Sequence, residues 1–201
     1  MGQYYYPTIV EGNRLKVFYS HDYENGLKLM EHSYIGNDFV NAVVSQIDDN
    51  PMKVAWIGDY SDEQYGDPYE KKLLRKQFMS IFKRVMARKK YEKPEPIKQS
   101  ISSISGYLVN HTQKIVINLK KYVAANNQHY TWFDKECNIC IHPLPLLTAC
   151  GNGRGGGDYW DKYPDYDKVG TWAFDVIEYT HKKPKGYSDV MYRFTEEERA
   201  E

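Results

Sequence analysis

Two stretches near the N-terminus are dominated by apolar residues with high strand propensity, and a third stretch alternates apolar with polar residues, which is the pattern of a strand with one buried face. Residues 3–10 and 14–19 are rich in β-branched and aromatic side chains, and the intervening Glu11-Gly12-Asn13 is typical of a hairpin turn. Residues 26–31 are the alternating stretch and predict a third strand. We therefore expect the chain to open with a hairpin that is followed by another strand.

The period changes at Asp38 to that of a helix. Apolar residues from Phe39 to Ile47 are spaced as one helix face, and Asn37 or Asp38 is a suitable N-cap. Pro51 follows the predicted end of this helix. Residues 54–57 then form a short apolar run and predict a buried strand.

A second and longer helix is predicted for residues 69–90. Leu74, Phe78, Ile81 and Val85 recur at three- and four-residue steps, while the many cations fall largely on the other side. Pro68 stands where the first turn of a helix accepts proline. This amphipathic spacing is the clearest structural signal in the chain.

The rest of the chain predicts further β structure. Residues 106–110 and 114–119 form a second hairpin pattern, residues 144–149 a short helical turn, and residues 169–180 a late strand. Strands that come in hairpins, interrupted by two substantial helices, favour an α+β fold with a mainly antiparallel sheet. A length of 201 residues predicts a single domain, with residues 195–201 as a polar tail.

Composition limits the function. The formal net charge is zero, so there is no global field that would recruit nucleic acid or a membrane surface. The chain shows neither an apolar run of bilayer length nor a signal segment, and we therefore expect a cytoplasmic protein that does not associate with membranes. Tyrosine is enriched, at 19 of 201 residues, which raises the expectation of a recognition surface.

The most unusual segment is the glycine-rich run GNGRGGGD from Gly151 to Asp158. Glycine permits positive φ and bare backbone N–H groups, so successive amides can converge on a phosphate or carboxylate. Arg154 would add a bidentate cation, and Asp158 would accept from a ribose hydroxyl or hold a metal. The alternative is a tight corner where glycines let two backbones cross. The predicted ligand-binding residues are Asn152, Gly153, Arg154, Gly155, Gly156, Asp158, Tyr159, Trp160 and Trp172, the aromatic ones by stacking.

Four polar residues are candidates for acid–base chemistry. His21, His32 and Asp59 lie near predicted strand ends, and the sheet could bring them to Asp158 in the glycine-rich run. The alternative is a set of solvated turn residues and hydrogen-bonded strand ends. None of these residues has the spacing of a recognised catalytic motif, so the sequence assigns no catalytic residue.

Three cysteines and a histidine have part of the spacing of a zinc site. Cys137 and Cys140 are separated by two residues, and His142 and Cys150 follow. The second half of the site lacks a closely spaced pair, and buried cysteine behaves as a small apolar residue. Burial is therefore the favoured interpretation, with no metal and no disulfide framework.

The long helix carries cations that suit an acidic protein or a nucleic acid. The residues predicted to contact such a partner are Arg75, Lys76, Lys83, Arg84 and Arg88. Neighbouring tyrosines could stack on bases. The alternative is that these cations form the solvated side of a helix whose other side enters the core.

Several motifs resemble a family of small uncharacterised proteins carried by bacteria, their phages and mobile elements. They are the opening MGQYY, the segment GLKLMEH at residues 26–32, the segment HPLPLLTA at residues 142–149 before the glycine-rich run, and GTWA at residues 170–173. The resemblance covers most of the chain. It implies a shared fold and an accessory protein of a phage or mobile element, and it brings no established activity or cofactor.

Three functional hypotheses follow. In the first, the protein binds a phosphorylated or nucleotide-like small molecule at the glycine-rich run and sequesters a host defence signal. In the second, it inhibits a host defence protein or nucleoprotein through a tyrosine-rich surface and the basic helix. In the third, it is a phosphoryl or glycosyl hydrolase or transferase. The oligomeric state and any cofactor stay unassigned.

Overall fold

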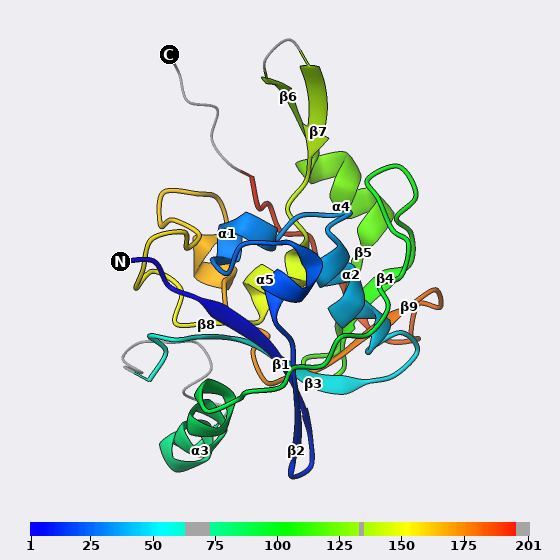
Figure 1. Cartoon of the computed structure of the whole chain (residues 1–201). Coiled ribbons are helices and arrows are strands. Elements are labelled where there is room, and N and C mark those ends of the chain that lie inside the picture. Colours follow the sequence, from blue (N-terminus) through cyan, green and yellow to red (C-terminus); the bar gives the residue numbers. More distant parts are fainter. Residues whose placement is uncertain (63–72, 133–134, 196–201) are drawn as a thin grey trace.

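One large sheet forms the centre of the molecule (Figure 1). The computed structural model describes residues 1–62, 73–132 and 135–195. In those residues the sheet has eight strands in the order β10-β5-β4-β9-β3-β1-β2, with β8 paired to β3 beside that path. The strands of the sheet are β1 (Tyr5–Glu11), β2 (Arg14–Val17), β3 (Met52–Gly58), β4 (Tyr107–Asn110), β5 (Ile115–Asn118), β8 (Ala149–Cys150), β9 (Val176–Thr180) and β10 (Ser188–Asp189).

Most neighbouring strands run antiparallel, which confirms the predicted α+β fold with a mainly antiparallel sheet. Both predicted hairpins are present as β1–β2 and β4–β5. The short pairs β3–β8 and β5–β10 are parallel. A separate two-stranded sheet of β6 (Gln128–Trp132) and β7 (Lys135–Ile139) projects beyond the helices (Figure 1).

The two faces of the sheet bury different cores. Along β3, Val54 and Trp56 join a large core on one face, and Ala55 and Ile57 join a smaller core on the other. The large core is covered by helices, grouped together in Figure 1: α1 (Leu29–His32), α2 (Asp38–Ser45), α4 (Leu119–Asn126) and α5 (Pro143–Leu147). On the other face α3 (Arg75–Met86) packs by itself.

Local sequence signals explain α2 and α3. The Asn37 side chain caps α2 by accepting from the backbone N–H groups of Phe39 and Val40, as predicted. The inner stripe of α3 consists of Phe78, Phe82 and Val85, which are buried. This helix begins at Arg75, later than predicted, and Pro68 lies outside the described residues.

Three predictions of local structure were wrong. Residues 26–31 do not form a strand, because β2 and β3 occupy both edges of β1, and the segment instead ends in the helix α1. The late strand is limited to Val176–Thr180, since the turn before it places Phe174 at φ 63°. There are three substantial helices in the described residues, because Asn118 caps the helix α4 directly after a strand. The tail at 196–201 lies outside the described residues.

Candidate functional site

The glycine-rich run lies at the end of β3, against the first residues of the chain. Its position is set by β8, whose Ala149 and Cys150 pair in parallel with Trp56 and Ile57. The run then crosses the N-terminal segment. Gly156 donates its N–H to the carbonyl of Met1 over 3.0 Å, and its own carbonyl accepts from the N–H of Gln3 over 3.2 Å.

Close packing accounts for several of the glycines. A Cβ atom on Gly155 would stand 2.5 Å from Cβ of Gln3 and 2.6 Å from its backbone nitrogen. Gly157 has φ of 87°, and a Cβ there would stand 2.3 Å from Cδ of Lys28. The geometry therefore matches the alternative interpretation of the run, in which glycines let two backbones cross.

Asp158 occupies the anion-binding concavity that the glycines form. Its Oδ2 atom accepts the backbone N–H groups of Gly153, Arg154 and Gly155 at 2.8, 2.9 and 3.0 Å. Its Oδ1 atom accepts the hydroxyl of Tyr5 at 2.9 Å. The side chain is almost completely buried, and this burial raises the pKa of Asp158 while the four hydrogen bonds oppose that rise. The predicted convergence of amides is present, but an internal carboxylate fills it.

Two further contacts hold the run in place. The side chain of Asn152 makes two hydrogen bonds with the backbone of Tyr159, accepting its N–H and donating to its carbonyl, both at 2.9 Å. Arg154 donates from Nη1 to the carbonyl of Tyr60 at 2.9 Å. Asn152 is therefore a structural residue, while the guanidinium of Arg154 is anchored at one corner.

A pocket of about 420 Å³ opens beside this run. Trp160 lies at its border with 57% of its surface exposed, which makes it a large aromatic residue open to solvent. The volume is in the range of small-molecule sites. The pocket is lined by Met1, Gly153, Arg154, Gly155, Gly156, Asp158, Tyr159, Trp160, Asp161 and Tyr166.

Seven of the nine predicted binding residues line this pocket, and Asn152 and Trp172 do not. Trp172 is fully buried in the large core, so the prediction that its ring stacks on a ligand was wrong. Tyr159 borders the pocket, but its ring is buried and its hydroxyl donates to the carbonyl of Pro164 at 2.8 Å. Trp160 is therefore the predicted aromatic residue that the structure leaves open for stacking.

The acid–base candidates have separate partners and are not hydrogen-bonded to one another in the described residues. His32 is buried, accepts from Nε1 of Trp56 at 3.1 Å and lies 3.0 Å from the carbonyl of Gly26. Its burial lowers the pKa of His32 to about 4. His32 is thus a neutral core residue with both ring nitrogens in use.

His21 and Asp59 occupy other surroundings. His21 is exposed and its Nδ1 lies 3.2 Å from the hydroxyl of Tyr19. Asp59 accepts the N–H of Tyr4 at 2.9 Å, and partial burial raises the pKa of this carboxyl group. These contacts fit the interpretation of strand-end and turn residues, and they provide no shared centre for acid–base chemistry.

Two of the three cysteines, Cys140 and Cys150, confirm the prediction of burial. Cys140 packs in the large core and Cys150 in the smaller one, so the sheet separates them, and neither forms a disulfide. Burial raises the pKa of Cys140 to about 12. His142 caps α5, with Nδ1 accepting the N–H of Leu144 at 3.1 Å, and the side chain of Cys137 lies outside the described residues. Among the described residues no group of three or more His, Cys, Asp or Glu side chains could hold a metal ion.

Two cations of the predicted partner-binding set have structural contacts. Arg84 donates from Nη2 to the carbonyl of Asn13 at 2.6 Å, and Arg88 donates to the carbonyl of Leu15. Both acceptors belong to the β1–β2 hairpin at one edge of the sheet. The other three, Arg75, Lys76 and Lys83, are exposed.

Sequence reasoning missed residues that reach these positions from far away. Tyr5 contacts Asp158, and Met1, Asp161 and Tyr166 line the pocket. A separate polar cluster was also missed: Nε2 of His111 lies 2.7 Å from the Glu178 carboxylate, and its Nδ1 lies 2.9 Å from the Tyr187 hydroxyl. The alternation of side chains along β1 could have indicated that Tyr5 is buried. It could not have indicated that Tyr5 contacts Asp158, because the two residues are far apart in the sequence.

Comparison with family models, curated proteins and solved structures finds no match for this chain. The resemblance to phage and mobile-element proteins therefore stays a prediction. Within residues 1–62, 73–132 and 135–195 no helix combines the length and the apolar character that crossing a bilayer requires. The geometry of the pocket is accordingly the basis for a functional proposal.

Proposed function

We propose that the pocket beside the glycine-rich run binds a phosphorylated or nucleotide-like small molecule, and that the protein acts by sequestering it. The observation that carries this proposal is that Arg154 and the exposed ring of Trp160 line the same pocket of about 420 Å³. A guanidinium suits a phosphate group, and an indole face suits a planar base. The pocket therefore offers both kinds of contact that a nucleotide needs.

The run presents these groups from a rigid base. Asp158 accepts hydrogen bonds from three consecutive backbone amides of the run. Gly156 makes two backbone hydrogen bonds with the N-terminal segment, one through its N–H and one through its carbonyl. Binding to a preorganised pocket costs less conformational entropy than binding to a mobile loop. In this mechanism the amides of residues 153–155 shape the pocket, and the anion is contacted by Arg154.

The contacts of the residues that line the pocket favour binding of the ligand without its chemical conversion. The carboxylate of Asp158 accepts four hydrogen bonds within the protein. Its neighbour Asp161 is exposed at the pocket border, and none of the histidines in the described residues lines this pocket. A general base needs a lone pair within reach of the substrate, and the geometry of Asp158 directs its lone pairs inward.

The test is a binding screen with nucleoside mono-, di- and triphosphates and cyclic dinucleotides. We expect at least one of them to raise Tm and to quench tryptophan fluorescence. Trp56 and Trp172 are fully buried, and absence of the quench in Trp160→Ala would assign it to Trp160 and not to Trp132. Trp160→Ala and Arg154→Ala should each weaken that ligand at least tenfold. Arg14→Ala is the matched control, because Arg14 is exposed and pairs with Glu11 at one end of β1, whereas Tyr5 at the other end pairs with Gly58 near the glycine-rich run.

Two results would contradict the proposal. One is an unchanged Tm for the wild-type protein across the whole panel. The other is equal weakening by Arg154→Ala and Arg14→Ala, which would place the contact outside the pocket. Recovery of the ligand intact after incubation with magnesium or manganese distinguishes sequestration from hydrolysis.

A further inference from the structure

The outer face of α3 carries cations that have no acidic partner among the described residues. Between residues 73 and 91 the sequence contains no Asp or Glu. In the described part of the chain, five cations of this segment are exposed and form no ion pair: Arg75, Lys76, Lys83, Lys89 and Lys90. The net charge of the whole chain is zero, so these five cations create a local positive potential on one side of the molecule.

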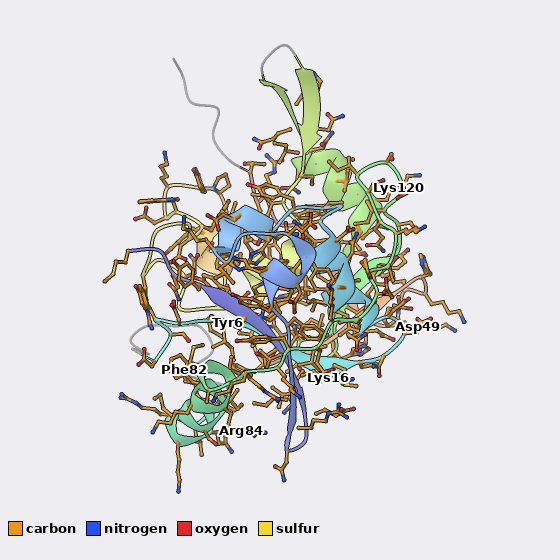
Figure 2. All side chains as sticks on the ribbon, viewed as in Figure 1. Tyr6, Lys16, Asp49, Phe82, Arg84 and Lys120 are labelled. Atoms are coloured by element: carbon orange, nitrogen blue, oxygen red, sulfur yellow. The ribbon has the colours of Figure 1, made fainter. Side chains whose placement is uncertain are left out.

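The helix that carries these cations is fixed to the sheet. Phe78, Phe82 and Val85 are buried in the smaller core. Arg84 and Arg88 donate to the carbonyls of the β1–β2 hairpin, so these two cations hold the helix in place. Figure 2 shows Tyr6, Phe82 and Arg84 at this end of the molecule, with long side chains of α3 extending away from the sheet.

A cluster of tyrosine rings adjoins the end of this cationic face. Tyr91 follows Lys90 directly and stacks on Tyr19 with ring centroids 4.7 Å apart and planes at 16°. Tyr6 lies 6.3 Å from Tyr19 and 6.2 Å from Tyr91, and its plane is within 14° of both. All three side chains are partly exposed, and Tyr6 and Tyr91 also pack against the smaller core.

Carboxylates lie beside the tyrosines and away from the helix sequence. Burial is the largest cause of the raised pKa of Tyr6 and of Tyr91, and the neighbouring tyrosines come next. Asp59 makes a smaller contribution to the pKa of Tyr6, and Asp22 to that of Tyr91. Negative charge therefore stands at the tyrosine cluster, while positive charge stands on α3. This arrangement separates a place for phosphates from a place for bases, whose N–H groups can donate to carboxylates.

We infer that α3 and the tyrosine cluster bind single-stranded nucleic acid, with the phosphates along the helix and bases against Tyr6, Tyr19 and Tyr91. Single strands bind where a cationic track adjoins aromatic rings, and every base has a face that can stack. An acidic protein could bind to the cations, but its carboxylates would be repelled by those beside the tyrosine rings. The aromatic neighbours therefore favour nucleic acid. The inference is independent of the small-molecule pocket.

Fluorescence anisotropy with labelled 20-nucleotide oligo(dT) and oligo(U) tests this inference on the full chain, and the two probes distinguish DNA from RNA. Five phosphate contacts predict that affinity falls roughly 100-fold between 50 and 200 mM salt. Lys76→Glu with Lys83→Glu should weaken binding at least tenfold. Lys120→Glu with Lys121→Glu is the matched control, since it makes the same charge change on exposed residues of α4 (Lys120 in Figure 2).

The tyrosine cluster has its own readout. Tyr91→Leu should weaken binding roughly 5- to 100-fold without changing the salt dependence, and Tyr91→Phe should restore it because the ring is retained. No binding of either probe at 50 mM salt would overturn the inference. Equal loss in the α3 and α4 double variants would also overturn it, as would complete competition by poly-glutamate at equal charge concentration, which would indicate an acidic protein.

Discussion

The hydroxyl of Tyr5 donates to Asp158 over 2.9 Å, and the two residues are separated by 153 positions in the sequence. The contact joins the first strand of the sheet to the glycine-rich run, whose amides bind the other oxygen of the same carboxylate. One buried carboxylate therefore fixes both the shape of the run and its position on the sheet. The pocket that contains Arg154 and Trp160 depends on that position.

Replacing Asp158 should unfold the run. Asp158→Ala leaves three amides and one phenol without their acceptor, and we expect a loss of roughly 3–5 kcal/mol in the free energy of unfolding, measured with urea. Formate or acetate should recover part of this loss, because the empty concavity can bind a small carboxylate. Asp161→Ala, on an exposed neighbour, should change stability by less than about 0.5 kcal/mol. A loss below about 1 kcal/mol in Asp158→Ala would show that the amides find other partners.

His32 should make stability depend on pH in the acidic range. Its folded-state pKa is about 4, below the usual value of 6.5, so the unfolded chain binds more protons between these two values. The contribution of His32 is therefore complete above pH 6.5 and is lost as the pH falls towards 4. The difference corresponds to roughly 3 kcal/mol.

Urea unfolding of the wild-type protein and of His32→Gln across pH 4–7 measures this effect. Glutamine can accept from Trp56 and donate to the carbonyl of Gly26 without titrating, so the pH dependence should become shallower. Burial lowers the pKa of His142 to about 3, so His142 also makes the protein less stable as the pH falls. The stability of His32→Gln should therefore still depend on pH, but less steeply than that of the wild-type protein. Identical slopes in the two proteins would show that folding does not lower the pKa of His32.

Local signals in the sequence predicted the parts of the fold that depend on neighbouring residues. The cap at Asn37 and the hairpin turn at Gly12-Asn13 depend on residues close in the chain, and both were found. Of the predicted apolar stripe of α3, Phe78 and Val85 are buried, whereas Leu74 precedes the helix and is 72% exposed. The segment before His32 alternates like a strand, yet it forms α1. The segment cannot pair with β1, because β2 and β3 occupy both edges of that strand, and the alternation of its own residues does not reveal this.

The sequence pointed to the segment beside which the pocket lies, but not to the group that fills its concavity of amides. Glycine content correctly indicated a concavity of amides, because that follows from backbone freedom at residues 151–157. The occupant of the concavity could not be predicted, since Asp158 and Tyr5 meet only through the folded sheet. Trp172 shows the same limit: an aromatic residue suits a core and a binding site equally, and its burial is decided by long-range packing.

The crossing of the two backbones should be sensitive to one methyl group. Gly155→Ala would place Cβ 2.5 Å from Cβ of Gln3 and near its backbone, so the strand or the run must move. We expect a loss of roughly 2–3 kcal/mol in the free energy of unfolding. Gly156→Ala is the matched control, because a Cβ there would meet nothing closer than 3.7 Å. Equal stability of the two variants would mean that the run is loosely packed.

The arginine contacts at the edge of the sheet should stabilise the fold, whereas the exposed cations of α3 should not. Arg88 donates to the carbonyl of Leu15 on β2, an edge strand whose outer carbonyls lack a neighbouring strand. Arg88→Ala should therefore cost roughly 1–2 kcal/mol of unfolding free energy. Lys83→Ala, on the exposed side of the same helix, should change it by less than about 0.5 kcal/mol. If both variants match the wild-type protein in urea, the contact of Arg88 does not stabilise the fold, and Arg88 would join the cations available to a partner.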